Sequence, residues 1–249
     1  GRGGRVESNG NFHGAPVAYV LDFLAIPVAD VASMSERRTD RFLDKARNHG
    51  LPPFLADDPG VDSGLMIAQY TQAAVVSELK RLAVPASVDS IPSSAMQEDH
   101  VSMGWGAARK LRRAVDGLSR VVAIEVMTAA RALDLRAAAL GVSPSPATGA
   151  VVDLLRSSGV EGPGPDRHLS PEIETCVDLV RSGAVLAAAF RTQSRAVLQA
   201  RSSGPVGRRH QLLAEGLDLA QAHRAAAGPG HDVVLADREL ARRQAALGG

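Results

Sequence analysis

The longest regular pattern in the sequence is a run of apolar residues spaced three and four apart between residues 107 and 133. Its members are Ala107, Leu111, Val115, Leu118, Val122, Val126, Ala129 and Leu133. This spacing places them on one face of a single helix of about eight turns. No stretch of any length alternates apolar and polar residues as a half-buried strand does. The sequence therefore predicts a largely helical chain.

Shorter helical patterns lie on both sides of this run. The spacing predicts helices at residues 16–35, 63–82, 148–157, 170–181 and 184–201, with weaker patterns at 208–226 and 233–246. Pro27 is expected to kink or break the first of them. The predicted apolar stripe of that helix is Val20, Leu21, Leu24, Val28, Val31, Ala32 and Ser35.

The stretch Ser93–Met103, just before the long helix, combines a helix-start signal with several polar groups. Ser94 and Gln97 have the spacing of a capping box, which predicts that the helix begins here. The acids at positions 98 and 99 would then lie in the first turn, where the helix dipole favours carboxylates. In an alternative interpretation, Gln97, Glu98 and His100 form a rigid, pre-oriented site. The residue types alone do not decide between the two.

Composition narrows the functional classes. The net charge is +1 and aromatic residues are 3% of the 249 residues, which argues against a nucleic-acid partner. The basic cluster at residues 109–113 is interpreted as a solvated helix face. The single cysteine, Cys176, permits no intrachain disulfide and favours a reducing, cytoplasmic setting. The most apolar run, residues 17–34, is interrupted by Asp22, Pro27 and Asp30, so no membrane span is predicted.

Other familiar chemistries find no support in the sequence. There is no nucleophile elbow, no phosphate-binding glycine loop and no pair of histidines at metal-binding spacing. A metal at Glu98, Asp99 and His100 is disfavoured, because successive residues of a helix point to different faces. No metal site is therefore predicted.

Six blocks of sequence, in order, resemble the histidine ammonia-lyases, particularly the actinobacterial type, over about residues 5 to 190. The blocks are Ser8–Gly14, Ser35–Arg38, Leu51–Leu55, Ser63–Gln69, Ser87–Pro92 and Met96–Met103. The resemblance implies an all-α homotetramer built around a bundle of long helices, of the ammonia-lyase and aspartase-like type. It also implies the non-oxidative elimination of ammonia from L-histidine to give urocanate.

The family's electrophile is a methylidene-imidazolone group, which forms by cyclisation of an Ala-Ser-Gly triplet. No Ala-Ser-Gly occurs in these 249 residues. The family's tyrosine base and its carboxylate-binding arginine also belong to segments upstream of the resemblance. We therefore predict that this chain alone has no lyase activity.

Four positions are expected to contribute to a substrate site. Phe12 is similar to the family's aromatic residue beside the prosthetic group, and Met66 to a residue near the substrate imidazole. Glu98 is similar to the carboxylate that contacts the imidazole and assists proton movement, and Gln97 beside it is assigned to substrate binding. Related phenylalanine and tyrosine lyases carry an amide in place of this glutamate, so Glu98 favours histidine as the substrate.

The resemblance divides the chain into a lyase-like helical part, residues 1–190, and a divergent tail rich in Ala, Arg and Gly, residues 191–249. The tail beyond residue 202 is expected to be weakly ordered and dispensable. Two functional alternatives remain open: a helical assembly piece of the same fold without chemistry, and a lyase or aminomutase acting on another aromatic amino acid.

Overall fold

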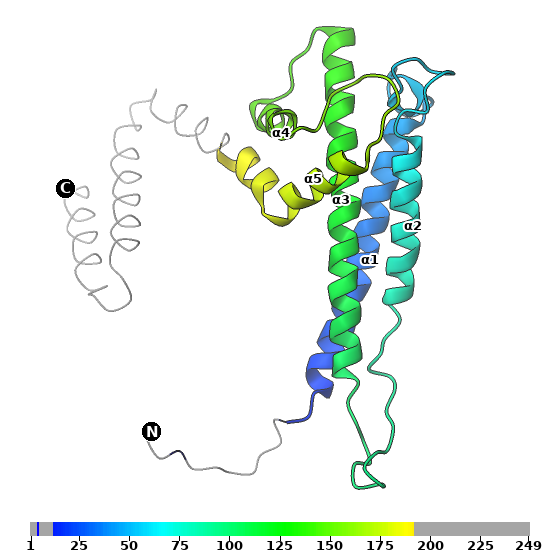
Figure 1. The fold of residues 1–249 in the computed structure, drawn as a ribbon, viewed down its shortest axis with the longest axis vertical. Helices are drawn as coiled ribbons and strands as arrows, with labels where there is room; N and C mark the ends of the chain where they lie inside the picture. Colours follow the sequence, from blue (N-terminus) through cyan, green and yellow to red (C-terminus); the bar gives the residue numbers. More distant parts are fainter. Residues whose placement is uncertain (1–3, 5–11, 192–249) are drawn as a thin grey trace, which may run out of the picture. The chain divides into compact units, whose positions relative to one another are not determined.

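Three long helices that run side by side dominate the computed structural model, which describes residue 4 and residues 12–191 (Figure 1). They are α1 (Ala15–Leu43), α2 (Met66–Leu82) and α3 (Gly104–Leu140), and each packs against the other two. The 3-10 turn η1 (Pro53–Leu55) precedes α2, and α4 (Pro146–Ser157) and α5 (Ser170–Arg181) follow α3. The described residues contain two isolated bridges and no named strand. The predicted all-α class is confirmed.

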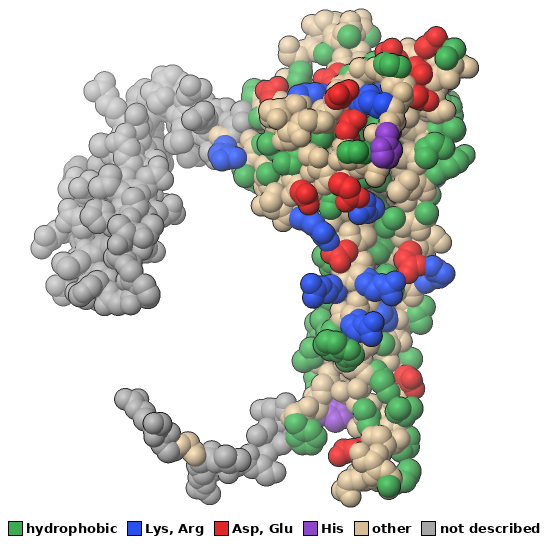
Figure 2. Space-filling model, viewed as in Figure 1, with side chains coloured by type: hydrophobic (Ala, Val, Ile, Leu, Met, Phe, Trp, Pro, Cys, Tyr) green, Lys and Arg blue, Asp and Glu red, His purple; other side chains and the backbone are tan. Residues whose placement is uncertain are grey.

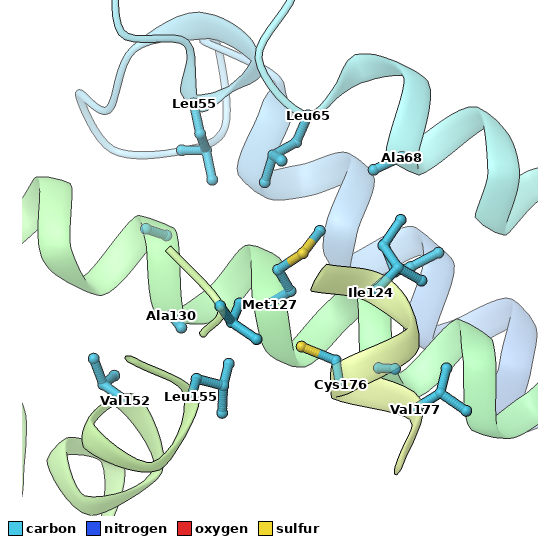
Figure 3. Close-up of a cluster of buried hydrophobic side chains, with 14 of the residues drawn as sticks. Leu55, Leu65, Ala68, Ile124, Met127, Ala130, Val152, Leu155, Cys176 and Val177 are labelled. Atoms are coloured by element: carbon cyan, nitrogen blue, oxygen red, sulfur yellow. The ribbon is translucent and has the colours of Figure 1, made fainter. Parts of the chain in front are cut away.

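The main hydrophobic core lies where the second half of α3 meets α4, α5 and the segment before α2 (Figure 3). Ile124 and Met127 of α3 pack there with Leu155 of α4 and Val177 of α5. Cys176 is part of the same core, and its burial raises the pKa of the thiol to about 12. The thiol is therefore protonated at neutral pH and has little nucleophilic character.

A second, smaller cluster joins the three long helices along their length. Its buried members are Ala29, Ala32, Val76, Leu79, Ala114 and Val121. Gly117 lies in the same contact, where a β-carbon would come within 2.9 Å of the Leu79 side chain. The axes of α2 and α3 thus approach closely because small residues occupy the seam.

Helix α1 buries Ala32 and Ser35 of the predicted stripe but leaves three of its large residues exposed. The large residues Val20, Leu24 and Val31 of the predicted stripe are 58%, 43% and 41% exposed. The buried residues are mostly small or polar: Ala18, Asp22, Ala25, Ala29, Ala32, Ser35, Glu36, Thr39 and Leu43. Small side chains let α1 lie close to α3, and this close approach outweighs the hydrophobicity of the larger residues. Pro27 lies inside α1 on its exposed side without ending the helix.

The predicted capping box is wrong. Helix α3 begins at Gly104 rather than near Ser94, and no side chain caps it. Ser94, Ala95 and Met96 all have positive φ, which a right-handed helix cannot accommodate. The other end of α3 is regular: Gly141, at φ 64°, donates its N–H to Ala137 O at 2.9 Å.

Helix α1 is the one described helix that is long and apolar enough, by length and composition, to cross a membrane. The interruptions at Asp22, Pro27 and Asp30 do not remove it from that class. Core helices of bundles meet the same criterion, and α1 buries Asp22 and Glu36 against its neighbours. The absence of a membrane partner remains a prediction.

Contacts along the chain separate residues 1–188 from residues 189–249. The predicted helix at 184–201 is helical as far as it is described, to residue 191. The rest of the predicted tail, including the patterns at 208–226 and 233–246, lies outside the described residues, as do residues 5–11.

Candidate functional site

The loop of residues 93–103, which we call the Glu98 loop, carries two of the predicted site residues. Ser93 and Glu98 exchange backbone hydrogen bonds of 2.9 and 3.2 Å, and Gln97 N donates to Ser94 O at 3.1 Å. The resulting tight turn presents Gln97 and Glu98 as exposed side chains. Because Glu98 lies well ahead of Gly104, it is not a first-turn acid of α3. Of the two interpretations of this stretch, the helix-dipole one is excluded.

The connection that leads into the Glu98 loop is held by a buried ion pair. Lys110 Nζ lies 2.9 Å from Asp22 Oδ1, and Ser87 N donates to Asp22 Oδ2 at 2.8 Å. Burial alone would raise the pKa of Asp22, but the bonds from Lys110 and Ser87 outweigh it and lower the pKa to about 2. Nearer the tip, Val101 N donates to Ser90 Oγ at 3.0 Å. The carboxylate of Asp22 thus orients the connection that leads to Glu98.

Lys110 corrects the interpretation of the basic cluster. Figure 2 shows basic side chains gathered about midway along the long helices. Arg109, Arg112 and Arg113 are exposed, as expected of a solvated face. Lys110 is instead turned inward onto Asp22, and its side chain is 22% exposed. The cluster is therefore partly structural.

Phe12 is brought to the same end of the bundle as Glu98. The next residue, His13, stacks on His100 with ring centroids 5.5 Å apart and planes 5° apart. His13 Nε2 also lies 3.1 Å from His100 O. A β-carbon on Gly14 would come within 2.9 Å of Ser102 Oγ, so the two segments approach closely here and a larger residue would require the Ser102 side chain to move. Phe12 itself is 83% exposed.

Met66 lies at the other end of the bundle. It is the first residue of α2, whose 17 residues run back to the connection that leads into the Glu98 loop. At 1.5 Å per residue, α2 is about 25 Å long, and residues 83–92 lie between its end and the Glu98 loop. Within one chain, the structure brings Phe12, Gln97 and Glu98 to one end of the bundle and does not bring Met66 to them.

The start of α2 is held by residues that the sequence analysis missed. Asp166 Oδ2 and Oδ1 accept from Ser63 N at 2.7 Å and Gly64 N at 2.8 Å, and these bonds lower the pKa of Asp166. Arg131, only 5% exposed, donates to Leu55 O at 2.8 Å and Gly164 O at 2.9 Å. Asp166 and Arg131 belong to no motif, and only the fold brings them to these backbone atoms.

Two of the blocks quoted above meet at a polar contact between α1 and α2. Glu36, 5% exposed, accepts from Gln69 Nε2 at 2.5 Å and from Arg37 Nε at 2.6 Å. Ser35 Oγ donates to Glu125 Oε2 of α3 at 2.6 Å, and Arg38 also pairs with this carboxylate. Buried charges require such partners. These residues fix the register of the three helices.

The bundle of long helices, with the predicted site residues in loops and at helix ends, can now be compared with known proteins. The sequence model of the aromatic amino acid lyases matches residues 1–157. The chain belongs to this family.

Within the family, the chain is similar to several histidine ammonia-lyases. The chain is 72% identical to histidine ammonia-lyase of Streptomyces coelicolor over 186 residues, which are 75% of this chain and 36% of the relative. It is 49% identical to histidine ammonia-lyase of Caldanaerobacter subterraneus over 73% of this chain and 35% of that protein. The chain thus spans about a third of the length of these relatives.

Solved structures of the same family share the fold. The structure of histidine ammonia-lyase from Trypanosoma cruzi has a TM-score of 0.70 at 40% identity, and covers 76% of this chain and 36% of that one. The tyrosine aminomutase of Streptomyces globisporus has a TM-score of 0.69 at 35% identity, and covers 77% and 36%. The expected ammonia-lyase type of all-α bundle is therefore confirmed.

The residues present do not fit the formation of the family's methylidene-imidazolone. That group is made from an Ala-Ser-Gly triplet, and the two Ala-Ser pairs of this chain continue to Met34 and Val88 instead of glycine. Both pairs also have structural surroundings of their own: Ser33 Oγ donates to Ala29 O within α1, and Ser87 N is bound by Asp22. No chemical step through the group is assigned to this chain.

Proposed function

We propose that this chain supplies the substrate-recognition part of a histidine ammonia-lyase, which eliminates ammonia from L-histidine to give urocanate. The observation that carries the proposal is the Glu98 carboxylate, exposed on a tight turn beside the segment that holds Phe12. The 72% identity to histidine ammonia-lyase of Streptomyces coelicolor over the same residues supports it.

Glu98 acts as the catalytic group of this part. Its carboxylate accepts a hydrogen bond from an imidazole N–H of the substrate and stabilises the imidazole when it carries positive charge. Enclosure by further protein would strengthen this interaction, because a lower dielectric constant reduces the attraction between charges less than water does. Gln97 and Phe12 contact the substrate from the same end of the bundle, through an amide and through an aromatic face.

We further propose that the working form is a homotetramer, in which one site takes residues from several copies. The exposed side of α1 carries large apolar side chains, including Val17, Val20, Phe23 and Ile26 at 51–66% exposure. Such a face on a bundle helix is typical of a buried subunit interface. Because the full length of α2, about 25 Å, lies between Met66 and the connection to Glu98 in one chain, a pocket lined by both must take them from different copies. A cytoplasmic location accords with this proposal.

The experiment that tests Glu98 uses a chimera in which residues 1–190 replace the matching segment of the Streptomyces coelicolor enzyme. Glu98→Gln keeps the size and hydrogen bonding of the side chain but removes its charge and basicity. We expect the rate of urocanate formation from histidine to fall roughly 10² to 10⁴-fold, as for the loss of a positioned acid–base group. Urocanate absorbance measures the rate.

The matched control is Asp99→Asn, which removes the neighbouring exposed carboxylate of the same loop. We expect this variant to retain the parent rate and both variants to keep the parent melting temperature. Equal rates for Glu98→Gln and the parent chimera would refute the assignment and leave the chain as a helical assembly piece.

A second candidate substrate is suggested by the likeness to tyrosine aminomutase, at 35% identity. The same chimera is therefore assayed with tyrosine and phenylalanine. The carboxylate of Glu98 favours histidine, since an imidazole can carry the positive charge that a carboxylate stabilises, whereas the ring of phenylalanine or tyrosine cannot. Turnover of tyrosine above that of histidine would reverse the choice of substrate.

A further inference from the structure

We propose that His13 is a positioning residue whose neutral Nε2–H form fastens the Glu98 loop to the start of α1. Its ring contacts both segments at once, through His100 on one side and Ala15 on the other. The inference rests on the proposed function for its catalytic consequence, but the attachment itself is a property of this chain and is tested separately below.

The hydrogen bonds of His13 select one tautomer. Its Nε2 lies 3.1 Å from the carbonyl oxygen of His100, which can only accept, so Nε2 carries the proton. Its Nδ1 lies 3.3 Å from the backbone N–H of Ala15, which can only donate, so Nδ1 is bare. The Nε2–H imidazole satisfies both partners, whereas the Nδ1–H tautomer satisfies neither.

The Glu98 loop needs such an attachment. Ser94, Ala95 and Met96 have φ of 56°, 53° and 70°, a left-handed run that is unfavourable for side chains other than glycine. Strain of this kind persists only where the surroundings hold it. Residues 83–104 connect α2 to α3, and the Glu98 loop is part of this connection. In the described part of the chain, the bond from His13 to His100 O is the one hydrogen bond that joins residues 93–102 to a segment outside this connection.

The stacked rings of His13 and His100 add contact area to the attachment that this hydrogen bond makes. The rings of His13 and His100 are nearly parallel, 5° apart, with centroids 5.5 Å apart, an offset arrangement that aromatic rings favour. Phe12 is the peptide neighbour of His13, and Glu98 lies two residues before His100. The contact between the two histidines therefore fixes the proposed aromatic and carboxylate groups of the site relative to each other.

Two substitutions separate the two hydrogen bonds of His13, because each keeps one of them and removes the other. In His13→Asn the amide oxygen takes the place of Nδ1 and keeps the bond from Ala15 N, but nothing reaches His100 O. In His13→Gln the amide nitrogen takes the place of Nε2 and keeps the donor to His100 O. Hydrogen exchange of the 249-residue chain, read by mass spectrometry on peptides covering 93–103, reports the attachment.

We expect exchange of the 93–103 peptides to accelerate about tenfold in His13→Asn, the equivalent of one lost hydrogen bond, and to stay close to the parent in His13→Gln. His100→Phe, which keeps the stacked ring and the carbonyl oxygen, should also resemble the parent. Nitrogen-15 spectra should show His13 as the Nε2–H tautomer, its signal being assigned by its loss in His13→Gln. Equal exchange in the Asn and Gln variants, or an Nδ1–H signal, would overturn the proposal.

The chimera carries the test through to function. We expect kcat/KM for histidine to fall about tenfold in His13→Asn and to recover in His13→Gln, with melting temperatures unchanged. A loop that loosens without any change in kcat/KM contradicts positioning. If the loop loosens as expected but Glu98→Gln leaves the rate unchanged, the attachment stands and the proposed function is the part that fails.

Discussion

At the scale of single residues, the structure depends on a few charged side chains, two of them buried, that each hold backbone atoms of a neighbouring segment. Asp22 binds Ser87 N, Asp166 binds two amides before α2, and Arg131 binds two carbonyl oxygens. The sequence gives no signal for these roles, because each depends on atoms far along the chain. Charged residues thus orient the connections, while apolar contacts hold the helices.

Asp22 offers a pH-dependent test of this arrangement. Its pKa falls from an ordinary 3.8 to about 2 in the folded chain, so the ion pair stabilises the fold above pH 4 and loses this effect as the pH falls towards 2. We expect Asp22→Asn to lower the free energy of unfolding by about 2 kcal/mol at pH 7. Urea unfolding at pH 7 and at pH 2.5 measures the difference, which should shrink at the lower pH.

The control is Asp116→Asn, which removes the exposed pair between Asp116 and Arg181. Surface pairs contribute little, so the change should stay within about 0.5 kcal/mol at either pH. A loss of the same size in both variants would show that the burial of Asp22 has no special effect.

At the scale of elements, periodicity in the sequence predicts the helices well and their faces less well. The patterns at 63–82, 148–157 and 170–181 match α2, α4 and α5 closely. The stripe predicted for α1 is only partly correct. Ala32 and Ser35 are buried as predicted, but hydrophobicity ranks Val20 and Leu24 above Ala18 and Ala25, whereas close packing on α3 selects the small residues. The helix start predicted at Ser94 fails because Ser94, Ala95 and Met96 carry no sequence sign of positive φ.

Substitutions on the two faces of α1 should have different effects: one on the stability of the fold and one on its assembly. Ala25→Leu adds bulk to a side chain that is 1% exposed and should lower the free energy of unfolding by about 1–3 kcal/mol. Phe23→Ser, at 66% exposure, should leave the helix content intact and shift the chain towards smaller species. Circular dichroism and sedimentation velocity measure the two effects. A parent chain that sediments as a 26.0 kDa monomer at micromolar concentration would contradict the proposed assembly.

At the scale of the whole molecule, the single chain contains the parts of a site but does not bring all of them together. The family and its helical bundle could be predicted from six short blocks. The same blocks supply the residues that we propose for the candidate site. What could not be predicted is their distribution: Phe12 and Glu98 lie at one end of the bundle and Met66 at the other. The length of α2 places Met66 and Glu98 at opposite ends of the bundle, and the short motifs do not indicate this separation.

The separation of Met66 from Glu98 has a genetic consequence. If one pocket takes these residues from different copies, two inactive alleles can complement each other. Consider one chimera inactivated by a substitution at Met66 and another inactivated at Glu98, unfolded together and reassembled in equal amounts. Each pocket residue would be unsubstituted in half of the cases, so about a quarter of the pockets would contain both native residues. Residues drawn from the same copy would give none. Recovered activity in the mixture therefore reveals whether neighbouring copies share each pocket.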